Sequence, residues 1–140
     1  MTGTRTAVTP RTDVEAVDAF LDALAGGRPV PDDLFAADAT LDATVPDWRF
    51  GRLDGPAIRA QFAHWFADPG TYDELDRTPI PGGEVVRFAL SWTEGGVPHA
   101  CHQIHVLTVE GGRIVADTMF CGGRWDAGLL AQMEDARVRA

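Results

Sequence analysis

The chain has none of the features that mark a membrane protein or a nucleic-acid-binding protein. No apolar run approaches the roughly 18 residues that indicate a transmembrane helix. Basic residues are few: 12 Lys and Arg stand against 21 Asp and Glu, so the formal net charge is -9. That balance argues against nucleic acid or an anionic membrane as the main partner.

The sequence also shows no export signal and few cysteines. Residues 1–12 include two arginines but no apolar stretch of the kind that a signal peptide needs, so we expect a short disordered lead there. Only two cysteines occur, Cys101 and Cys121. Without an export signal they predict free thiols in a reducing compartment, and the cytoplasm is the expected location.

The length predicts one domain, residues 13–140, because 140 residues can form one core but not two ordinary ones. The composition, 45% apolar and 24% charged, is typical of a globular protein. No internal repeat or low-complexity segment is present.

Local signals predict helices in the first half of the chain. Thr12 and Glu15 form a capping-box pair ahead of an apolar face with helical period, and the helix ends at 26–27 in two glycines. Residues 31–35 suggest a short second helix, and 39–45 a strand. A further helix starts at Asp54-Gly55-Pro56 and ends at Pro69-Gly70.

From residue 72 the pattern changes to strands. We expect them at 72–78, 84–92, 97–109 and 113–121, separated by Gly-Gly hairpin connections, with a last helix over 125–137. Helices on one side of a mostly antiparallel sheet form an α+β fold. A sheet of this size curls, and helices across its concave face leave a pocket.

The last two strands carry most of the chemistry. Three of the four histidines and both cysteines lie here, with Asp117 in an otherwise apolar run. Because side chains alternate along a strand, His99, Cys101, Gln103 and His105 share one face.

The loop between these strands decides whether Asp117 joins that face. A two-residue Gly-Gly loop pairs Glu110 with Arg113 and places Asp117 on the face opposite to that of His105. A three-residue loop at 110–112 pairs His105 with Asp117, Gln103 with Met119 and Cys101 with Cys121. We favour the three-residue loop because it gathers the polar groups into one cluster.

The element order and three segments, 35–41, 55–62 and 110–115, resemble the NTF2-like (cystatin-like cone) superfamily over about residues 13–125. The resemblance implies a curved, mostly antiparallel sheet with helices on its concave face. It also implies a homodimer, because the convex face carries apolar residues that three helices do not cover.

Within that superfamily, Gln103 and His105 followed by Asp117 resemble the SnoaL-like polyketide cyclases. The resemblance implies that Asp117 is the base of an intramolecular aldol closure, without metal or cofactor, and that His105 and Gln103 are its partners or substrate donors. The asparagine that some members place in the first strand has no match, since this chain offers Asp42 or Ala43.

Two other enzyme groups of the superfamily fit less well. Phe20, Ala43 and His105 stand where steroid isomerases have a tyrosine, a catalytic aspartate and a protonated aspartate. Gln103 stands where limonene-type epoxide hydrolases have an arginine.

The acid–base interpretation has a physical basis. Desolvation makes a carboxylate in an apolar pocket a stronger base. An unperturbed imidazole titrates at about pH 6.5, so His105 can hand a proton to a developing enolate or alkoxide, and Gln103 can donate to the same oxygen. The alternative is that Asp117 and His105 form only a structural cross-strand pair.

A metal site is not expected. His99, Cys101, His105 and Cys121 are ligand types that zinc takes, but 99, 101 and 105 spread over roughly 20 Å of a flat strand. No Cys-x-x-Cys or His-Glu-x-x-His motif is present. Nucleophilic chemistry at either cysteine is possible, although paired thiols with aliphatic neighbours more often serve packing.

Further residues are expected in the pocket wall or in the core beside it. His102 faces the other side of the sheet, where it suits an interface, and His64 is expected to face solvent. The expected wall residues are Phe20, Trp48 (in a loop at the pocket mouth), Trp65, Phe66, Phe88, Leu90, His99, Cys101, Met119 and Cys121.

The sequence therefore predicts a cofactor-independent enzyme that cyclises or isomerises a polyketide-like or aromatic carbonyl compound. A dehydratase or an epoxide-hydrolase-type enzyme is the alternative within enzymes. A non-catalytic domain that binds a hydrophobic small molecule is the alternative outside them, because the fold does not fix the function.

Overall fold

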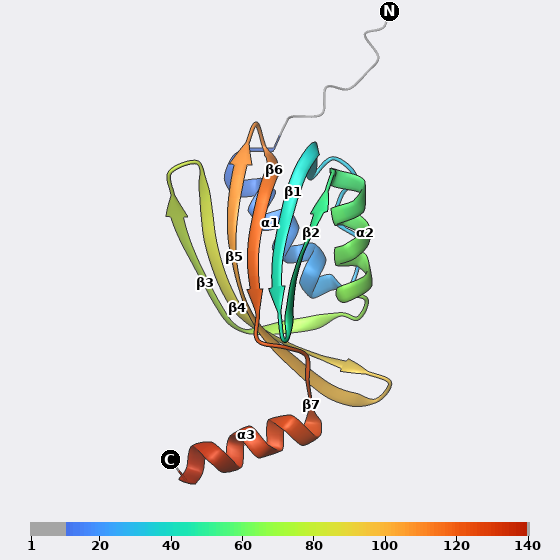
Figure 1. Ribbon diagram of the computed structural model, residues 1–140, viewed down its shortest axis with the longest axis vertical. Coiled ribbons are helices and arrows are strands. Elements are labelled where there is room, and N and C mark those ends of the chain that lie inside the picture. The colour runs from blue at the N-terminus through green and yellow to red at the C-terminus, as the bar shows by residue number, and fades with distance from the viewer. Residues whose placement is uncertain (1–10, 140) are drawn as a thin grey trace, which may run out of the picture.

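The computed structural model of the protein describes residues 11–139, so residues 1–10 of the expected lead lie outside it. A strongly curved sheet forms the body of the molecule (Figure 1). Its main strands follow the order β2-β1-β6-β5-β4-β3, in which only the β1–β6 pair is parallel. The strands are β1 (Phe35–Val45), β2 (Trp48–Leu53), β3 (Gly70–Ile80), β4 (Gly83–Glu94), β5 (Val97–Glu110), β6 (Arg113–Cys121) and β7 (Trp125–Asp126), which pairs with β5.

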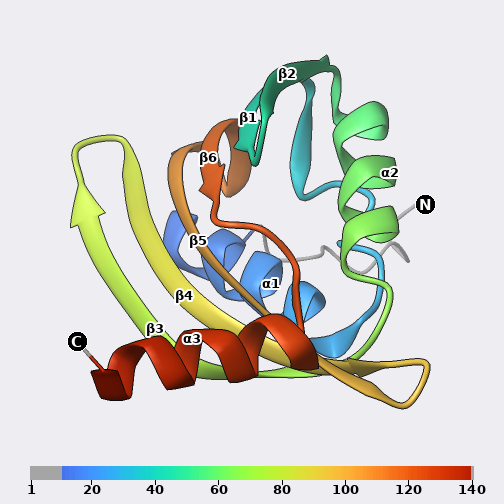
Figure 2. The ribbon, with the colours of Figure 1, turned by 60° about the horizontal axis from the view of Figure 1, so that its bottom comes forward.

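The helix α1 (Asp13–Gly26) begins and ends where its local signals place it. The backbone N–H of Glu15 donates to Thr12 Oγ1 over 3.1 Å, and the Glu15 carboxylate accepts from the Thr12 N–H over 2.9 Å. Gly27 ends the helix at a φ of 63°, which favours glycine. The expected first helix is confirmed. It lies in the concavity of the sheet (Figure 2), and its apolar residues are buried.

The helix α2 (Gly55–Trp65) is also confirmed, and Asp54 caps it by accepting from the Ala57 N–H over 2.8 Å. It packs against β1 and β2 at the other side of the concavity. The third helix, α3 (Ala127–Arg139), packs instead against β5 and β7 and lies apart from α1 and α2 (Figures 1 and 2). The concave face therefore carries two helices and not three.

Two expectations for the first half of the chain are wrong. Residues 31–35 form a turn that leads into β1, which starts at Phe35, and not a short helix. Trp48 is not in a loop, because Pro46 and Asp47 make a tight turn and the chain continues as β2. Asp47 adopts a φ of 75° there, which a short polar residue tolerates.

The β5–β6 register also differs from the expected one. Glu110 pairs with Arg113 across a two-residue turn, because Gly111 and Gly112 both adopt positive φ values, 60° and 76°, as a type I′ turn requires. The predicted pairs of His105 with Asp117, Gln103 with Met119 and Cys101 with Cys121 do not form. His105 pairs with Met119 and Gln103 with Cys121.

A β-bulge nevertheless brings Asp117 to the inner face. The ladder shifts between Val109, which pairs with Ile114, and Thr108, which pairs with Ala116, so Val115 is an extra residue in β6. The extra residue restores the alternation that a regular two-residue hairpin would have reversed. Asp117 then pairs with Leu107 and is 1% exposed.

The core lies between α1, α2 and the inner face of the sheet. Phe20, Phe62 and Phe88 are its largest fully buried side chains. Among residues 11–139, none of the helices has the length and apolarity to cross a membrane.

Candidate functional site

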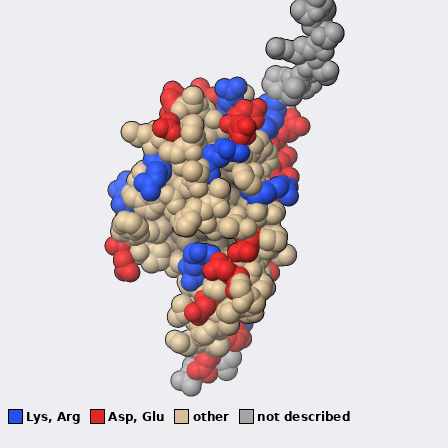
Figure 3. All heavy atoms as spheres, turned by 90° about the vertical axis from the view of Figure 1, so that its right-hand side faces the viewer, with Lys and Arg blue, Asp and Glu red and all other residues tan. Residues whose placement is uncertain are grey.

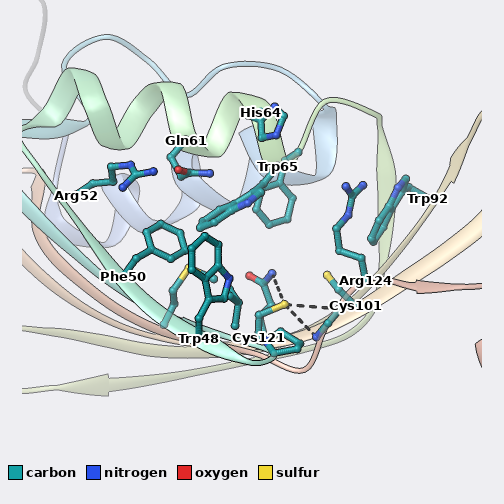
Figure 4. A pocket seen from close by; sticks show the side chains of 16 residues that line it. Trp48, Phe50, Arg52, Gln61, His64, Trp65, Trp92, Cys101, Cys121 and Arg124 are labelled. Atoms are coloured by element: carbon teal, nitrogen blue, oxygen red, sulfur yellow. Dashed lines mark hydrogen bonds between the residues drawn. The ribbon is translucent and has the colours of Figure 1, made fainter.

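A cavity of about 370 Å³ opens between α2, β2 and the lower ends of the central strands (Figure 4). This volume falls in the range of small-molecule sites. Figure 3 shows the molecule from the side of α2 and β2, where a broad area without charged groups is bordered by both acidic and basic ones. The wall residues are Val45, Pro46, Trp48, Phe50, Arg52, Gln61, His64, Trp65, Phe66, Trp92, Cys101, Gln103, Met119, Cys121, Gly123 and Arg124.

Aromatic rings form one side of the cavity. Trp48, Phe50 and Arg52 project from the same face of β2, since they alternate with outward residues. The Phe50 ring centroid lies 5.5 Å from that of Trp48 and 5.6 Å from that of Trp65 on α2. Trp48 is 67% exposed, so its indole is free to stack on a planar ligand.

Gln103 and Cys121 lie at the base of the cavity, side by side on paired strands. The Gln103 amide Nε2 donates to Cys121 Sγ over 3.2 Å, and the backbone N–H of Gly123 donates to the same sulfur over 3.3 Å. These contacts appear as dashed lines in Figure 4. Gln103 is only 7% exposed but belongs to the cavity wall, so its amide is a largely buried polar group that a ligand in the cavity can contact.

Behind Gln103 lies a buried histidine–aspartate pair. His105 Nε2 is 2.8 Å from Gln103 Oε1, and His105 Nδ1 is 2.8 and 3.0 Å from the two carboxylate oxygens of Asp117. The side chains of His105 and Asp117 have no exposed area. The structure thus brings together all three residues that the sequence proposes as catalytic, but only Gln103 lines the cavity.

Three phenyl rings enclose the imidazole of His105. Phe88 stacks on it at 5.5 Å with an interplanar angle of 14°, and Phe20 and Phe62 approach at 5.4 and 6.1 Å. Aromatic faces attract a cation. Phe20 and Phe88 were expected in the substrate pocket, and they hold His105 instead of lining the cavity.

The contacts of His105 place a hydrogen-bond acceptor beside each of its ring nitrogens. A carboxylate can only accept, so Nδ1 donates to Asp117. Because the Gln103 amide nitrogen donates to Cys121, its oxygen faces His105 and accepts from Nε2. This arrangement offers an acceptor to each ring nitrogen, so it suits an imidazolium beside a carboxylate.

The two thiols differ in their surroundings. Burial raises the pKa of the Cys101 thiol to about 12, so this group stays protonated at neutral pH. Cys121 is half-buried and belongs to the cavity base. The cysteines do not oppose each other across the strands, because Cys121 pairs with Gln103.

The remaining expected wall residues divide into two groups. Trp48, Trp65, Phe66, Cys101, Met119 and Cys121 line the cavity, whereas Leu90 is core. His99 is outside the wall: its Nδ1 contacts the Val97 carbonyl at 2.9 Å, and its ring stacks on that of Trp92 at 5.7 Å.

The structure also shows where His64, His102 and Asp42 lie. His64 is exposed as expected, but it stands at the cavity rim. His102 faces away from the cavity, and its buried Nε2 has no partner among the residues described. Asp42 binds Arg49 through two hydrogen bonds of 2.8 and 2.6 Å, so Ala43 and Leu41 are the inward residues of β1.

Sequence reasoning missed Arg52, Gln61, Trp92 and Arg124 in the cavity wall. A signal for Arg52 was present, because Trp48, Phe50 and Arg52 recur at every second position after a Pro-Asp turn. Within residues 11–139, no cluster of three His, Cys, Asp or Glu side chains is placed to hold a metal ion.

Comparison with known proteins shows the fold. No family model and no curated protein matches the chain. An NTF2-like protein from Anabaena variabilis aligns with a TM-score of 0.65 at 17% identity, over 84% of this chain and 96% of that one. A ketosteroid isomerase-like protein from Catenulispora acidiphila, solved with trimethylamine, aligns with a TM-score of 0.59 at 19% identity, over 79% and 88%.

A third similar structure is SalBIII, an epoxide hydrolase/cyclase-like enzyme of pyran ring formation in salinomycin. It aligns with a TM-score of 0.57 at 18% identity, over 79% of this chain and 90% of that one. The expected α+β, NTF2-like fold is therefore confirmed. Likeness at this identity extends to the fold alone, so the resemblance to SnoaL-like cyclases stays a prediction.

Proposed function

We propose that the protein is a cofactor-independent acid–base enzyme that isomerises or cyclises an aromatic or polyketide-like carbonyl compound. One observation carries the proposal: the hydrogen-bonded line from Asp117 through His105 to Gln103 runs from the core to the base of a ligand-sized cavity. The cyclase-like neighbour SalBIII supports it as a fold-level analogy.

The cost of the buried pair supports a functional role. Removing two charges from water costs several kcal/mol for each ion, and the mutual attraction offsets this only when geometry and further hydrogen bonds are good. Apolar side chains of similar size would fill the same space without that cost. A buried, hydrogen-bonded pair of ionisable side chains next to a cavity is therefore a candidate functional site.

The geometry favours the reverse of the catalytic roles that the sequence suggests for Asp117 and His105. Nε2 of His105 points toward Gln103 and the cavity, whereas Asp117 lies on the far side of the imidazole. Gln103 belongs to the cavity wall and contacts Nε2, so a rotation of its side chain would open Nε2 to the cavity, whereas the hydrogen bonds of Asp117 to His105 lie on the other side of the ring. We therefore assign proton transfer to His105 and the orientation of its ring to Asp117, as in other Asp–His pairs.

When the substrate turns the Gln103 amide away from His105, Nε2 gives its proton to solvent water, and the reaction starts from the resulting neutral His105, which keeps the Nδ1–H bond to Asp117. Nε2 takes a proton alpha to the carbonyl, the C–H electrons form a C=C bond, and the carbonyl electrons move to oxygen. The Gln103 amide N–H, turned into the cavity, donates to that oxygen. Return of the proton to another carbon completes an isomerisation.

A ring closure uses the same groups. The enolate carbon attacks a second carbonyl of the substrate, and a C–C bond forms while the carbonyl electrons become an alkoxide. His105 then gives its Nε2 proton to the alkoxide and returns to the neutral form. Asp117 stabilises the charged imidazolium between the two proton transfers.

Deuterium exchange at the alpha carbon of 1-tetralone, followed by NMR in D2O, tests the proton transfer without knowledge of the natural substrate. We expect the protein to accelerate exchange over buffer. His105→Gln should lower the accelerated rate by about 10²-fold, a typical contribution of a general acid–base group. Asp117→Asn should lower it by less, and His99→Gln, a histidine outside the cavity, should leave it unchanged.

A melting curve for each variant shows whether it is folded. Equal rates for the folded wild-type protein and His105→Gln would contradict the proposed role of His105. Absence of any acceleration would favour the second candidate function, a non-catalytic small-molecule-binding domain. The complete burial of His105 and Asp117 is the observation that favours this second candidate.

A further inference from the structure

The charges of the cavity wall differ from those of the whole molecule. The chain carries 21 acidic and 12 basic residues, yet the wall contains Arg52, Arg124 and His64 and no Asp or Glu. An acidic protein repels anions at long range, so a wall of the opposite sign is a local feature. This wall suits a ligand that carries a negative charge.

The two arginines lie at opposite ends of the cavity and are not equivalent (Figure 4). The Arg124 guanidinium is paired with the Glu94 carboxylate and lies 5.3 Å from the ring centre of Trp92. The Trp92 indole N–H, which donates to the Glu94 carboxylate, and the Arg124 charge together hold the pKa of Glu94 below its usual value, so the pair stays ionised. Its net charge is zero, and it offers little attraction to an anion.

Arg52 has no such partner. Its Nη1 donates to the Gly51 carbonyl over 3.0 Å, and its guanidinium carbon lies 4.8 Å from the centre of the Phe50 ring. Among residues 11–139, no carboxylate pairs with it. A guanidinium has five N–H donors, so most of its donors remain open to a ligand.

The surroundings of Arg52 orient it for a carboxylate. The contact with Phe50 holds the guanidinium over an aromatic face, which is favourable for a cation. Figure 4 draws the Gln61 side chain of α2 at the same end of the cavity, pointing toward Arg52. A planar guanidinium binds a carboxylate through two parallel N–H bonds, and the Gln61 amide adds a further donor.

We propose that the ligand of this cavity is a planar aromatic carboxylate. Its ring system lies against Trp48, Phe50 and Trp65, and its carboxylate binds Arg52 with Gln61. This inference rests on the proposed function only because both use the same cavity. With the carboxylate of the ligand at Arg52, the opposite end of its ring system reaches Gln103.

Anthraquinone-2-carboxylate and its neutral carboxamide form a matched pair of probes. They share one planar ring system and differ in charge, and neither has an alpha C–H bond, so binding is measured without turnover. Three of the four tryptophans, Trp48, Trp65 and Trp92, line the cavity. Quenching of tryptophan fluorescence therefore reports occupancy.

We expect the wild-type protein to bind the carboxylate about ten-fold tighter than the carboxamide, the usual scale of one charge-assisted contact. Arg52→Gln should remove this preference and leave the carboxamide affinity unchanged. Arg113→Gln removes the same charge from an exposed site outside the cavity, and it should retain the preference. Arg52→Lys should retain part of it, because the charge remains and the planar donor pair is lost.

Equal affinities of the two probes for the wild-type protein would overturn the proposal, and so would a preference that survives in Arg52→Gln. Loss of the preference in Arg124→Gln but not in Arg52→Gln would place the anion at the wrong end and would also overturn it. Carboxylate binding through Arg52 without exchange of 1-tetralone would uphold the ligand class and refute the proposed reaction.

Discussion

His105 Nδ1 lies 2.8 Å from Asp117 Oδ2, although the two residues are not cross-strand partners. His105 pairs with Met119 and Asp117 pairs with Leu107, so the hydrogen bond runs diagonally across the β5–β6 ladder. Diagonal neighbours on one face lie within reach of long side chains. The line from Asp117 to Gln103 depends on this diagonal contact.

The buried pair should show strong energetic coupling. Asp117→Asn and His105→Gln each leave a buried polar partner without its counter-charge, so each should lower the free energy of unfolding by about 3 kcal/mol. The double variant places two neutral amides in contact and should lose less than the sum. Urea unfolding of the four proteins should give a coupling free energy above about 1.5 kcal/mol.

The exposed pair of Asp42 and Arg49 is the matched control, because it has two short hydrogen bonds but lies in solvent. The same cycle with Asp42→Asn and Arg49→Gln should give no measurable coupling. Additive losses at Asp117 and His105 would show that the two groups do not interact as an ion pair.

The thiols should differ in reactivity. Burial raises the pKa of Cys101 to about 12, so iodoacetamide at pH 8 should modify Cys121 and leave Cys101 intact. Bound anthraquinone-2-carboxylate should slow the reaction of Cys121, which lines the cavity. Peptide mass spectrometry measures both sites, and equal labelling of the two cysteines in the folded protein would contradict the burial argument.

The raised pKa of Cys101 also predicts a pH dependence. The folded state keeps the Cys101 proton at a pH where the unfolded chain, with a thiol pKa of about 8.5, has lost it. The contribution of Cys101 to stability is thus complete below about pH 8.5 and is lost as the pH rises toward 12. The melting temperature of Cys101→Ala should therefore fall less steeply between pH 8 and pH 10 than that of the wild-type protein.

Arg77 should stabilise the fold without affecting the cavity. Its guanidinium binds Asp18 of α1 and Glu84 of β4, and Glu84 is 6% exposed. Arg77→Met leaves the Glu84 carboxylate buried without its partner, so we expect a loss of about 2 kcal/mol in urea unfolding. The affinity for anthraquinone-2-carboxylate should not change, and a change would show that this network reaches the cavity.

The convex face should form a homodimer interface. Phe120 is 50% exposed and pairs with the outward-facing Ile104, beside Val106 and Thr118. An exposed apolar patch of this kind often marks an interface. We expect sedimentation to show a dimer at tens of micromolar and Phe120→Glu to convert it to a monomer, whereas a wild-type monomer would refute the interface.

Local signals were enough to predict most of the fold. The capping box at Thr12, the Asp54 cap and the Gly-Gly turns act over a few residues, and the elements they predict are present. The β6 bulge is different, because β1 shifts its pairing with β6 at the same place, between Phe35 and Thr40. The β1 residues that pair with β6 at the bulge lie 75 residues or more away along the chain, so the sequence of the turn contains no information about them.

The site was predicted only in part, because it too depends on contacts between segments that are far apart in the sequence. Alternation along β5 placed Gln103 and His105 on one face, and the choice to include Asp117 was right although the register behind it was wrong. Which side of the imidazole faces the cavity depends on the bulge and on the phenyl rings around His105. Alternation contains no information about either.

NMR of the His105 ring nitrogens tests most directly whether the buried pair serves the cavity. In the free protein at neutral pH, we expect protons on both Nδ1 and Nε2. Saturation with anthraquinone-2-carboxylate should shift the Nε2 signal, because the ligand displaces Gln103 from it, and should leave the Nδ1 bond to Asp117 in place. An Nε2 signal that stays unchanged while tryptophan quenching shows the cavity to be full would contradict the account.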